Sequence, residues 1–547
     1  MSLNENNILD VHYNNEQHIL AHSIIENKLI DIISRLLPVQ GVSLGLNDNF
    51  FDLGGDSMMV IELISKAWEH GIKFNMQHVY EYPTIAGLAS KAIYEPIHDL
   101  TRHLSNNVVS KTLSLLPNQS AYAYTKSMTI ATYLLRPTFF LDKEKLESAI
   151  QRLIQRHEVL RISFIGNDLQ WQQVVNPYIS TPMIEYVHLE NTFTDMEREQ
   201  AINDYCHKLI KTMDIENKQV NLRAALFEWN SQQLFFLAID HYSFDELSMK
   251  LFWNEFYSAY LGKLLPLIEI PYSAVVEDLF RLAKKWDYRE DQLFWLKQHA
   301  QVVHIPKSVN NSSTINEGIK AKILVLQAKE WLGKFILNLT TSAGVQVYEV
   351  LLTAWVQTLS ISSGLPGVTM ILGSHNRGLS DGMVHTMGCF VTAYPLYFAA
   401  YPEGDARQTI DCLRTQLKQI PHKGMRYMLS MMIDPAWKET VFKAPQPSLG
   451  FNYLGEEEIN QEMWMGTERD EFKGKLVSIR KGELLSGRHQ ATNGIPYLII
   501  HCQVNTKSKI ITLTCDYDSG HYSESFIDDV LALYQKNIQL YACQLAT

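Results

Sequence analysis

FFDLGGDS (residues 50–57) is the stretch that decides how this chain is organised. Its two glycines let the backbone turn tightly, and the segment after Ser57 has apolar residues at helical spacing, among them Val60, Ile61 and Ile64. A phosphate group is well placed at a helix start, because the backbone N–H groups and the helix dipole favour negative charge there. The pattern therefore predicts that Ser57 presents an exposed hydroxyl at the start of a helix.

Helical patterns flank this stretch over residues 18–93. Apolar residues recur every three or four positions between 24 and 37, and Thr84 in YPTIAGLA (82–89) is expected to cap a last short helix. A lone GGDS fits any helix after a glycine turn, but the longer pattern resembles the peptidyl carrier domains of nonribosomal peptide synthetases. The resemblance implies a small all-α four-helix domain in which a phosphopantetheinyl transferase attaches 4'-phosphopantetheine to Ser57.

Composition limits what the rest of the chain can be. A length of 547 residues predicts three or four folding units. The net charge of -11 argues against a nucleic-acid partner, and no apolar run approaches the roughly 18 residues of a membrane span. The N-terminus lacks the basic and apolar regions of a signal peptide, and the six cysteines show no metal-binding spacing. We expect a cytoplasmic protein without a metal site.

A long α/β segment follows the helical part. Residues 94–112 have mixed polar composition and are interpreted as a linker. An apolar strand over 233–239 then ends in DHYSFDE (240–246), so that His241 stands where a buried strand gives way to a loop, with Asp245 four residues on. This position suits acid–base chemistry, although the same spacing is common for a structural histidine.

Ordered motifs along this segment resemble those of the condensation-domain superfamily of nonribosomal peptide synthetases. RHEVLRISF (156–164) is similar to the family's RHExLRTxF, and DHYSFDE aligns with its active-site motif HHxxxDG. That alignment places His241 on the second histidine and Asp245 on the aspartate. Further matches are LSLLPNQ, YREDQLFW and GCFVT, at residues 113–119, 288–295 and 388–392.

The resemblance implies two chloramphenicol-acetyltransferase-like lobes in a V-shaped pseudo-dimer, an N-lobe over 113–285 and a C-lobe over 286–547. A tunnel between the lobes would admit the donor arm from one side and the acceptor from the other. His241 would be the catalytic residue, as a general base or as a hydrogen-bond acceptor that orients the attacking amine. Asp245 would be structural and would pair with Arg377 on the second lobe.

Three positions depart from the condensation pattern. Asp240 replaces the first histidine, Glu246 replaces the motif glycine and Thr392 replaces an asparagine. Two alternatives remain open for Glu246. Its carboxylate either narrows the donor path and adds negative charge near a cationic acceptor, as Asp240 would, or it points into solvent.

Two other functions are compatible with parts of the chain. FNYLGE (451–456) and PHKGMRY (421–427) resemble motifs of epimerization domains, which invert the α-carbon of a carrier-bound aminoacyl thioester. Those enzymes have a glutamate beside the histidine, in a motif EGHGRE, whereas this chain has Gly373 there. Condensation is therefore favoured over epimerization. A non-catalytic docking domain with the same fold is the third alternative.

Nothing follows the large domain in this sequence, so the acceptor is expected to be a carrier on another protein or a soluble amine. The layout resembles the terminal carrier–condensation proteins of anguibactin- and acinetobactin-type siderophore assembly. That resemblance implies loading of Ser57 by an upstream adenylation enzyme or carrier module in trans. It also implies an N-hydroxyhistamine-like small-molecule acceptor, whose attack would release a siderophore by forming an amide.

Overall fold

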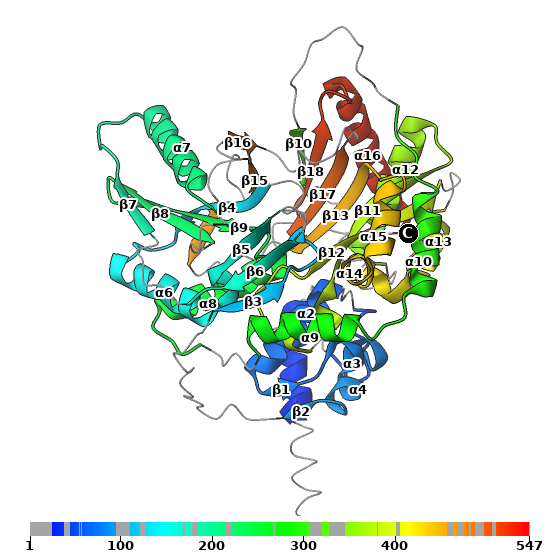
Figure 1. Ribbon diagram of the computed structural model, residues 1–547, viewed down its shortest axis with the longest axis horizontal. Coiled ribbons are helices and arrows are strands. Elements are labelled where there is room, and N and C mark those ends of the chain that lie inside the picture. The colour runs from blue at the N-terminus through cyan, green and yellow to red at the C-terminus, as the bar shows by residue number, and fades with distance from the viewer. Residues whose placement is uncertain are drawn as a thin grey trace, which may run out of the picture.

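The chain folds into a small N-terminal domain and two larger lobes, each lobe built on its own β-sheet (Figure 1). The computed structural model describes residues 24–37, 44–53, 55, 57–94, 110–120, 127–167, 170–177, 184–214, 216, 221–265, 270–306, 308, 319–327, 345–379, 381–384, 386–400, 405–456, 463–467, 475–480, 483–486, 497–505 and 510–545. No helix within these ranges is long and apolar enough to cross a membrane.

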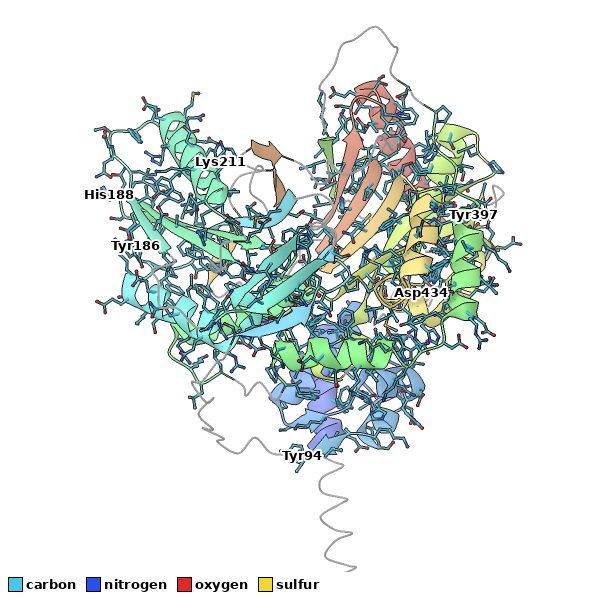
Figure 2. All side chains as sticks on the ribbon, viewed as in Figure 1. Tyr94, Tyr186, His188, Lys211, Tyr397 and Asp434 are labelled. Atoms are coloured by element: carbon cyan, nitrogen blue, oxygen red, sulfur yellow. The ribbon has the colours of Figure 1, made fainter. Side chains whose placement is uncertain are left out.

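The N-terminal domain is helical, as its apolar spacing predicts. Its helices are residues 24–36, α2 (Ser57–Glu69), α3 (Met76–Glu81) and α4 (Ile85–Ala89). The expected cap is confirmed, because the Thr84 hydroxyl accepts a hydrogen bond from the Gly87 N–H at 3.1 Å. A two-residue ribbon of β1 (Ile72–Lys73) and β2 (Ile93–Tyr94) closes the domain, and Figure 2 shows Tyr94 at the end that points away from the lobes.

The first lobe is built on a seven-stranded sheet in the order β16-β15-β4-β9-β8-β7, with β14 also paired to β4. The strands are β4 (Ser127–Pro137), β7 (Ile184–His188), β8 (Leu222–Trp229), β9 (Gln232–Asp240), β14 (Trp464–Thr467), β15 (Lys475–Arg480) and β16 (Glu483–Ser486). Its helices are α6 (Lys143–Arg156), α7 (Asp195–Lys211), α8 (Glu246–Tyr260) and α9 (Tyr272–Ala283). A small sheet beside it contains β3 (Lys111–Ser114), β5 (Ile162–Asn167) and β6 (Gln170–Val175), and the turn η1 (Glu158–Arg161) precedes β5.

The second lobe has a six-stranded sheet in the order β10-β18-β17-β13-β11-β12. The strands are β10 (Ile319–Gln327), β11 (Gly367–His375), β12 (Val391–Ala399), β13 (Leu449–Glu456), β17 (Leu498–Asn505) and β18 (Ile510–Asp518). The helices are α10 (Arg289–His299), α12 (Val347–Ser363), α13 (Ala406–Lys418), α14 (Tyr427–Ile433), α15 (Pro435–Lys443) and α16 (Glu524–Leu545). Short turns η2 (Asn376–Leu379), η3 (Asp381–Val384) and η4 (Pro421–Gly424) connect these elements.

The lobes are not two consecutive stretches of chain. The sequence places all of 286–547 in the second lobe, whereas β14, β15 and β16 leave it and pair with the first lobe's sheet. Strands β14 and β15 both bind the edge of β4 that faces away from β9. This pairing satisfies backbone groups that an edge strand would otherwise expose, and it ties the second lobe to the first.

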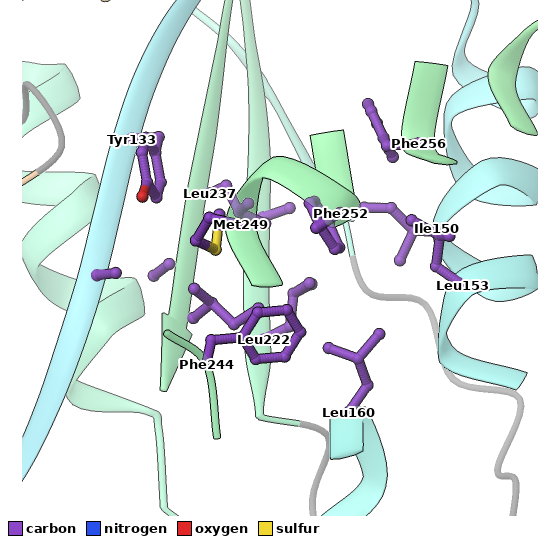
Figure 3. Packing of buried hydrophobic residues seen from close by; sticks show 14 of the residues in the cluster. Tyr133, Ile150, Leu153, Leu160, Leu222, Leu237, Phe244, Met249, Phe252 and Phe256 are labelled. Atoms are coloured by element: carbon purple, nitrogen blue, oxygen red, sulfur yellow. The ribbon is translucent and has the colours of Figure 1, made fainter. Parts of the chain in front are cut away.

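The core of the first lobe lies where α8 packs on the sheet. Figure 3 shows Phe244, Met249 and Phe252, from the start of α8 and the turn before it, among Leu222 of β8 and Leu237 of β9. All of these side chains are buried, because β9 is apolar on both faces and helices cover it. The rigid packing on both sides holds the short turn between β9 and α8, which contains His241.

Candidate active site

His241 is the first residue after β9, in a short turn that leads into α8. Its backbone N–H donates to the carbonyl of Thr129 on β4 at 2.8 Å, which fixes the turn to the neighbouring strand. The side chain of His241 is half-buried, whereas Asp240 before it is fully buried. A histidine that is partly accessible on a backbone held from both sides is suited to acting on a bound substrate.

Asp240 faces inward and shapes this turn. Its Oδ2 accepts a hydrogen bond from the Ser243 hydroxyl at 2.7 Å, and Asn221 Nδ2 donates to that same hydroxyl at 2.9 Å. Its Oδ1 is buried without a hydrogen-bond partner among the described residues. Burial raises the pKa of Asp240 to about 7, against the opposing effect of hydrogen bonds from Ser243 and Tyr242. Because the carboxyl is enclosed, Asp240 stabilises the conformation of the turn through its hydrogen bonds and does not place a charge at the protein surface.

Asp240→Asn should therefore stabilise the protein at alkaline pH. The raised carboxyl pKa means that the folded state keeps a proton which the unfolded chain loses near pH 4, so the penalty for Asp240 grows as pH rises to 7 and is complete above it. We expect a gain in unfolding free energy of about 2 kcal/mol at pH 5 and about 4 kcal/mol at pH 8. Urea denaturation at both pH values measures this difference. Asp529→Asn, an exposed change on α16, should show no comparable gain.

Asp245 and Arg377 form a buried ion pair between the lobes. Arg377 Nη2 lies 2.7 Å from Asp245 Oδ1, and neither side chain is exposed to solvent. Asp245 Oδ1 also accepts from the N–H and hydroxyl of Ser248, at 2.8 and 2.7 Å, as the N-cap of α8. Arg377 donates in addition to the carbonyl oxygens of Met383 and Thr386. The pair therefore fixes the start of α8 to the segment that follows β11.

The GCFVT segment closes over this ion pair. Phe390 donates its backbone N–H to Asp245 Oδ2 at 3.1 Å, and its ring lies 4.9 Å from the Arg377 guanidinium. The Cys389 thiol accepts from Asn118 Nδ2 at 3.2 Å, and burial raises the pKa of Cys389 to about 12. Cys389 is thus a neutral thiol near neutral pH and not a nucleophile. The Thr392 hydroxyl is buried without a hydrogen-bond partner in the described part of the chain.

RHEVLRISF joins elements that surround the site and does not enter it. His157 Nε2 and Arg156 Nε lie 2.7 and 2.9 Å from the Glu255 carboxylate on α8, and together they outweigh burial and lower the pKa of Glu255. Glu158 accepts the Ser273 N–H at 2.7 Å at the start of α9. Arg161 donates to the Asn176 carbonyl at 3.1 Å. The motif is a structural brace for α8 and α9.

The N-terminal domain rests against the start of α8. Its apolar core cluster continues into Leu247 of α8 and Val384 of η3, which are both buried. Gln346 Nε2, at the start of α12, donates to the Gly55 carbonyl at 2.7 Å, two residues before Ser57. Lys250 Nζ lies 4.0 Å from Glu62 Oε2 on α2. Helix α2, which begins at Ser57, therefore lies against the first turns of α8, which starts five residues after His241.

Only glycine fits at position 55 of the FFDLGGDS turn. A Cβ at Gly55 would lie 2.2 Å from the Phe50 ring, which is too close for any real contact. The Gly55 N–H donates to the Phe50 carbonyl at 2.9 Å, so the FFDLGGDS turn folds back on itself. Ser57 is the first residue of α2, as the sequence predicts.

A strained turn of the second lobe also contacts the N-terminal domain. Lys423 Nζ lies 3.2 Å from the centroid of the Tyr80 ring on α3. His422 and Lys423 both have left-handed backbone conformations, with φ of 47° and 53°. Side chains other than glycine adopt this conformation at a cost of roughly 1–3 kcal/mol each, and such strain clusters at binding and catalytic sites. The PHKGMRY segment thus forms part of the docking surface for the N-terminal domain.

The site combines residues that the sequence identifies with others that it does not. Several predicted elements meet around the start of α8. They are Asp245, Arg377 and the GCFVT segment, together with the turn that contains His241 and the backbone of Ser57. Glu246 is the first residue of α8 and is half-buried, and an acid there interacts favourably with the helix dipole. The docking residues Gln346, Lys250 and Lys423 carry no recognisable sequence signal, apart from the PHKGMRY match to another motif. No group of three or more His, Cys, Asp or Glu in the described ranges could hold a metal ion.

Comparisons with known proteins match both parts of the chain. A family profile described as "Condensation domain" matches residues 113–542, and one described as "Phosphopantetheine attachment site" matches residues 27–91. A linear gramicidin synthase of Brevibacillus parabrevis is 26% identical over 454 residues, which cover 80% of this chain and 9% of that protein. Gramicidin S synthase 1 of Brevibacillus brevis is 22% identical over 531 residues, which cover 94% of this chain and 47% of the other. The chain therefore spans less than half the length of these relatives.

Solved structures show the same fold. The epimerization domain from the third module of tyrocidine synthetase B superposes with a TM-score of 0.69 at 17% identity, covering 81% of this chain and 99% of that one. The first condensation domain of the CDA synthetase gives a TM-score of 0.56 at 13% identity, covering 81% and 97%. The condensation profile spans well over half of the 547 residues. The chain thus belongs to the condensation-domain family, amide-forming acyltransferases of nonribosomal peptide synthesis, and carries a phosphopantetheine attachment domain ahead of it.

Proposed function

We propose that the acyl or peptidyl thioester on the Ser57 phosphopantetheine arm is the donor for the condensation domain of the same chain. The observation that carries this proposal is the shared apolar cluster of the two domains, in which Leu247 lies six residues after His241. The Gln346 hydrogen bond to Gly55 holds the backbone just before Ser57 against the start of α12. An arm attached there would start at the edge of the turn that carries His241.

The proposed reaction is aminolysis of a thioester. The amine nitrogen attacks the carbonyl carbon, the new C–N bond forms, and the C–S bond to the arm breaks. One proton leaves the amine and one is gained by the departing thiolate. His241 would accept the hydrogen of the attacking amine, as a base or as an orienting partner, and such groups contribute roughly 10²–10⁴-fold to a rate. Asp245 and Arg377 hold the helix and loop around it.

For the acceptor, the proposal extends to a soluble basic amine of the N-hydroxyhistamine class and to a released product of the siderophore type. Glu246 supports a basic acceptor, because it is a half-buried acid five residues after His241. Asp240 does not add to this support, since its carboxyl is fully enclosed. Loading of Ser57 would come from an upstream adenylation enzyme or carrier module in trans, after a phosphopantetheinyl transferase has attached the arm.

Holo-protein loaded with an aminoacyl-pantetheine and held in deuterated buffer separates this function from epimerization. Condensation predicts that the acyl mass persists until an amine is added and that the α-carbon gains no deuterium. Epimerization would place deuterium at the α-carbon without release. We expect no exchange, because Gly373 has no carboxyl to assist proton removal. Replacement of the α-hydrogen by deuterium would favour the epimerase.

The docking surface gives a further prediction. Lys423→Ala should slow amine-dependent release from Ser57 by about 2- to 30-fold, because a cation–π contact contributes roughly 0.5–2 kcal/mol. Single-turnover release followed by intact-protein mass spectrometry measures the rate. Lys438→Ala is the matched control, since Lys438 lies 5.9 Å from the Phe442 ring within α15 and its loss should leave the rate unchanged. Equal rates for both variants would show that Lys423 does not guide the carrier.

A further inference from the structure

The second lobe carries a row of polar side chains on the face of its sheet that α12 and α16 do not cover. Along β13 and β17, Phe451 and Ile500 are buried in the apolar core, so their strand neighbours Asn452 and His501 point to the opposite face. Figure 1 shows α12 and α16 on one side of this sheet and the first lobe on the other. Asn452 and His501 are directly paired in the register of β13 and β17. The row therefore faces the first lobe.

The row fixes the orientation of one amide. His501 Nε2 lies 3.4 Å from Asp516 Oδ2 on β18, a position that favours a proton on that nitrogen. In the neutral tautomer with its proton on Nε2, His501 Nδ1 is an acceptor, and Asn452 Nδ2 lies 3.2 Å from it. Since the amide nitrogen of Asn452 donates to the ring, its Oδ1 must point away from His501. Asp516 and His501 are nearly fully buried, so this orientation is held firmly.

The amide oxygen points toward a position above Gly373 that is open among the described residues. A Cβ built on Gly373 meets Asn452 Oδ1 at 4.0 Å and no other heavy atom of the described residues within 4 Å. Gly373 is solvent-exposed, and Asn452 is half-buried. The absent side chain at 373 thus leaves space in front of a hydrogen-bond acceptor whose direction is set from behind.

Chain connections lead from this position to the ion pair beside the catalytic turn, since Gly373 pairs with Ala393, three residues after the Phe390 whose N–H donates to Asp245. Gly373 lies four residues before Arg377, and His241 lies four residues before Asp245, so each is within about 14 Å of its end of the buried ion pair. Strand β11 runs directly from Gly373 to the segment that contains Arg377. Both residues therefore approach the ion pair that joins the lobes, one from each lobe.

We propose that Asn452 Oδ1 and the space above Gly373 form the binding site for the amine acceptor, with His501 and Asp516 as positioning residues. The ligand class is a molecule with an N–H donor, either an ammonium or a hydroxylamine, that hydrogen-bonds to the amide oxygen. This inference rests on the proposed condensation function and adds the place where its acceptor binds. It also gives a role to the glycine that distinguishes this chain from epimerases, since a glutamate at 373 would fill the site.

Two substitutions test the site from different directions. Gly373→Val fills the space, and it should not weaken the fold because glycine destabilises a strand and Gly373 has no left-handed φ. Asn452→Leu removes the acceptor at nearly constant volume. Asn203→Leu is the matched control, because Asn203 is also a half-buried asparagine but lies on α7 of the first lobe. Binding of histamine and N-hydroxyhistamine to each holo-protein is measured by titration calorimetry, and amine-dependent release is measured separately.

We expect Gly373→Val and Asn452→Leu to weaken amine binding at least about tenfold and to raise KM for the amine with little change in kcat. Asn203→Leu should retain binding, and the melting temperature of Gly373→Val should be no lower than that of the unchanged protein. Unchanged amine affinity in both variants, or no amine binding by the unchanged protein, would overturn the site. Release that continues with unchanged KM in both variants would overturn the site while leaving the proposed function intact. Binding without any release would support the site and refute the proposed function.

Discussion

His241→Ala is expected to slow amine-dependent release of the acyl group from Ser57 by at least about a hundredfold, without changing how the arm is attached or loaded. The imidazole is the one half-buried basic group in the described turn between β9 and α8, and the backbone around it is fixed by the Thr129 carbonyl. Methyl replacement removes the acceptor for the amine hydrogen and leaves the turn in place. Intact-protein mass spectrometry of the loaded chain follows the loss of the acyl mass over time.

His188→Ala is the control for this experiment. His188 is exposed on β7, at the outer edge of the first lobe in Figure 2. The His188→Ala protein should therefore release the acyl group at the rate of the unchanged protein. A His241→Ala protein that releases as fast as the His188→Ala protein would remove His241 from the chemistry. The site would then serve docking alone, which is the non-catalytic alternative.

Asp245→Asn is expected to destabilise the protein by about 3–5 kcal/mol, and Arg377→Met by a similar amount. Each change leaves the opposite charge buried without its partner, in a position where neither side chain reaches solvent. The loss should appear as a lower urea midpoint and a lower soluble yield. Activity should fall mainly because less protein is folded, since Asp245 contacts Arg377, Ser248 and Phe390 and not the reacting atoms.

The ion pair between Lys111 and Glu277 provides the matched comparison. Its atoms lie 2.9 Å apart, close to the 2.7 Å of the buried pair, but its side chains are 41% and 55% exposed. Lys111→Ala should therefore cost no more than about 1 kcal/mol. An Asp245→Asn protein that is as stable as the unchanged one but inactive would contradict the structural role and assign Asp245 to the reaction.

Local patterns predict the helices and the central strand well, because each depends on neighbouring residues. The apolar spacing after Ser57 and the cap at Thr84 define the elements of the N-terminal domain, and the run ending at Asp240 is the buried strand β9. These helices and this strand depend on the spacing of apolar residues and on hydrogen bonds within a few residues. The pairing of Asp245 with Arg377 is predicted by the family resemblance. The spacing of residues along the chain does not predict it.

Contacts between distant segments are what the sequence does not predict. Strands β14 to β16 have no pattern that assigns them to the sheet of the first lobe, since an edge strand pairs through backbone groups common to all residues. Lys423 is a lone lysine in the sequence, and only the strained turn brings it to Tyr80. Asn452, His501 and Asp516 lie up to 64 residues apart, and the sheet register alone aligns them.

The most direct test is whether the acyl group on Ser57 reacts with the amine in the active site of its own chain. Loaded holo-protein is mixed with saturating amine at several protein concentrations, and the acyl mass is followed by intact-protein mass spectrometry. A docked carrier acts at a fixed effective concentration, so we predict first-order release with a rate constant that does not depend on protein concentration. An apparent rate constant that rises in proportion to protein concentration, or an acyl mass that persists with every amine, would contradict this prediction.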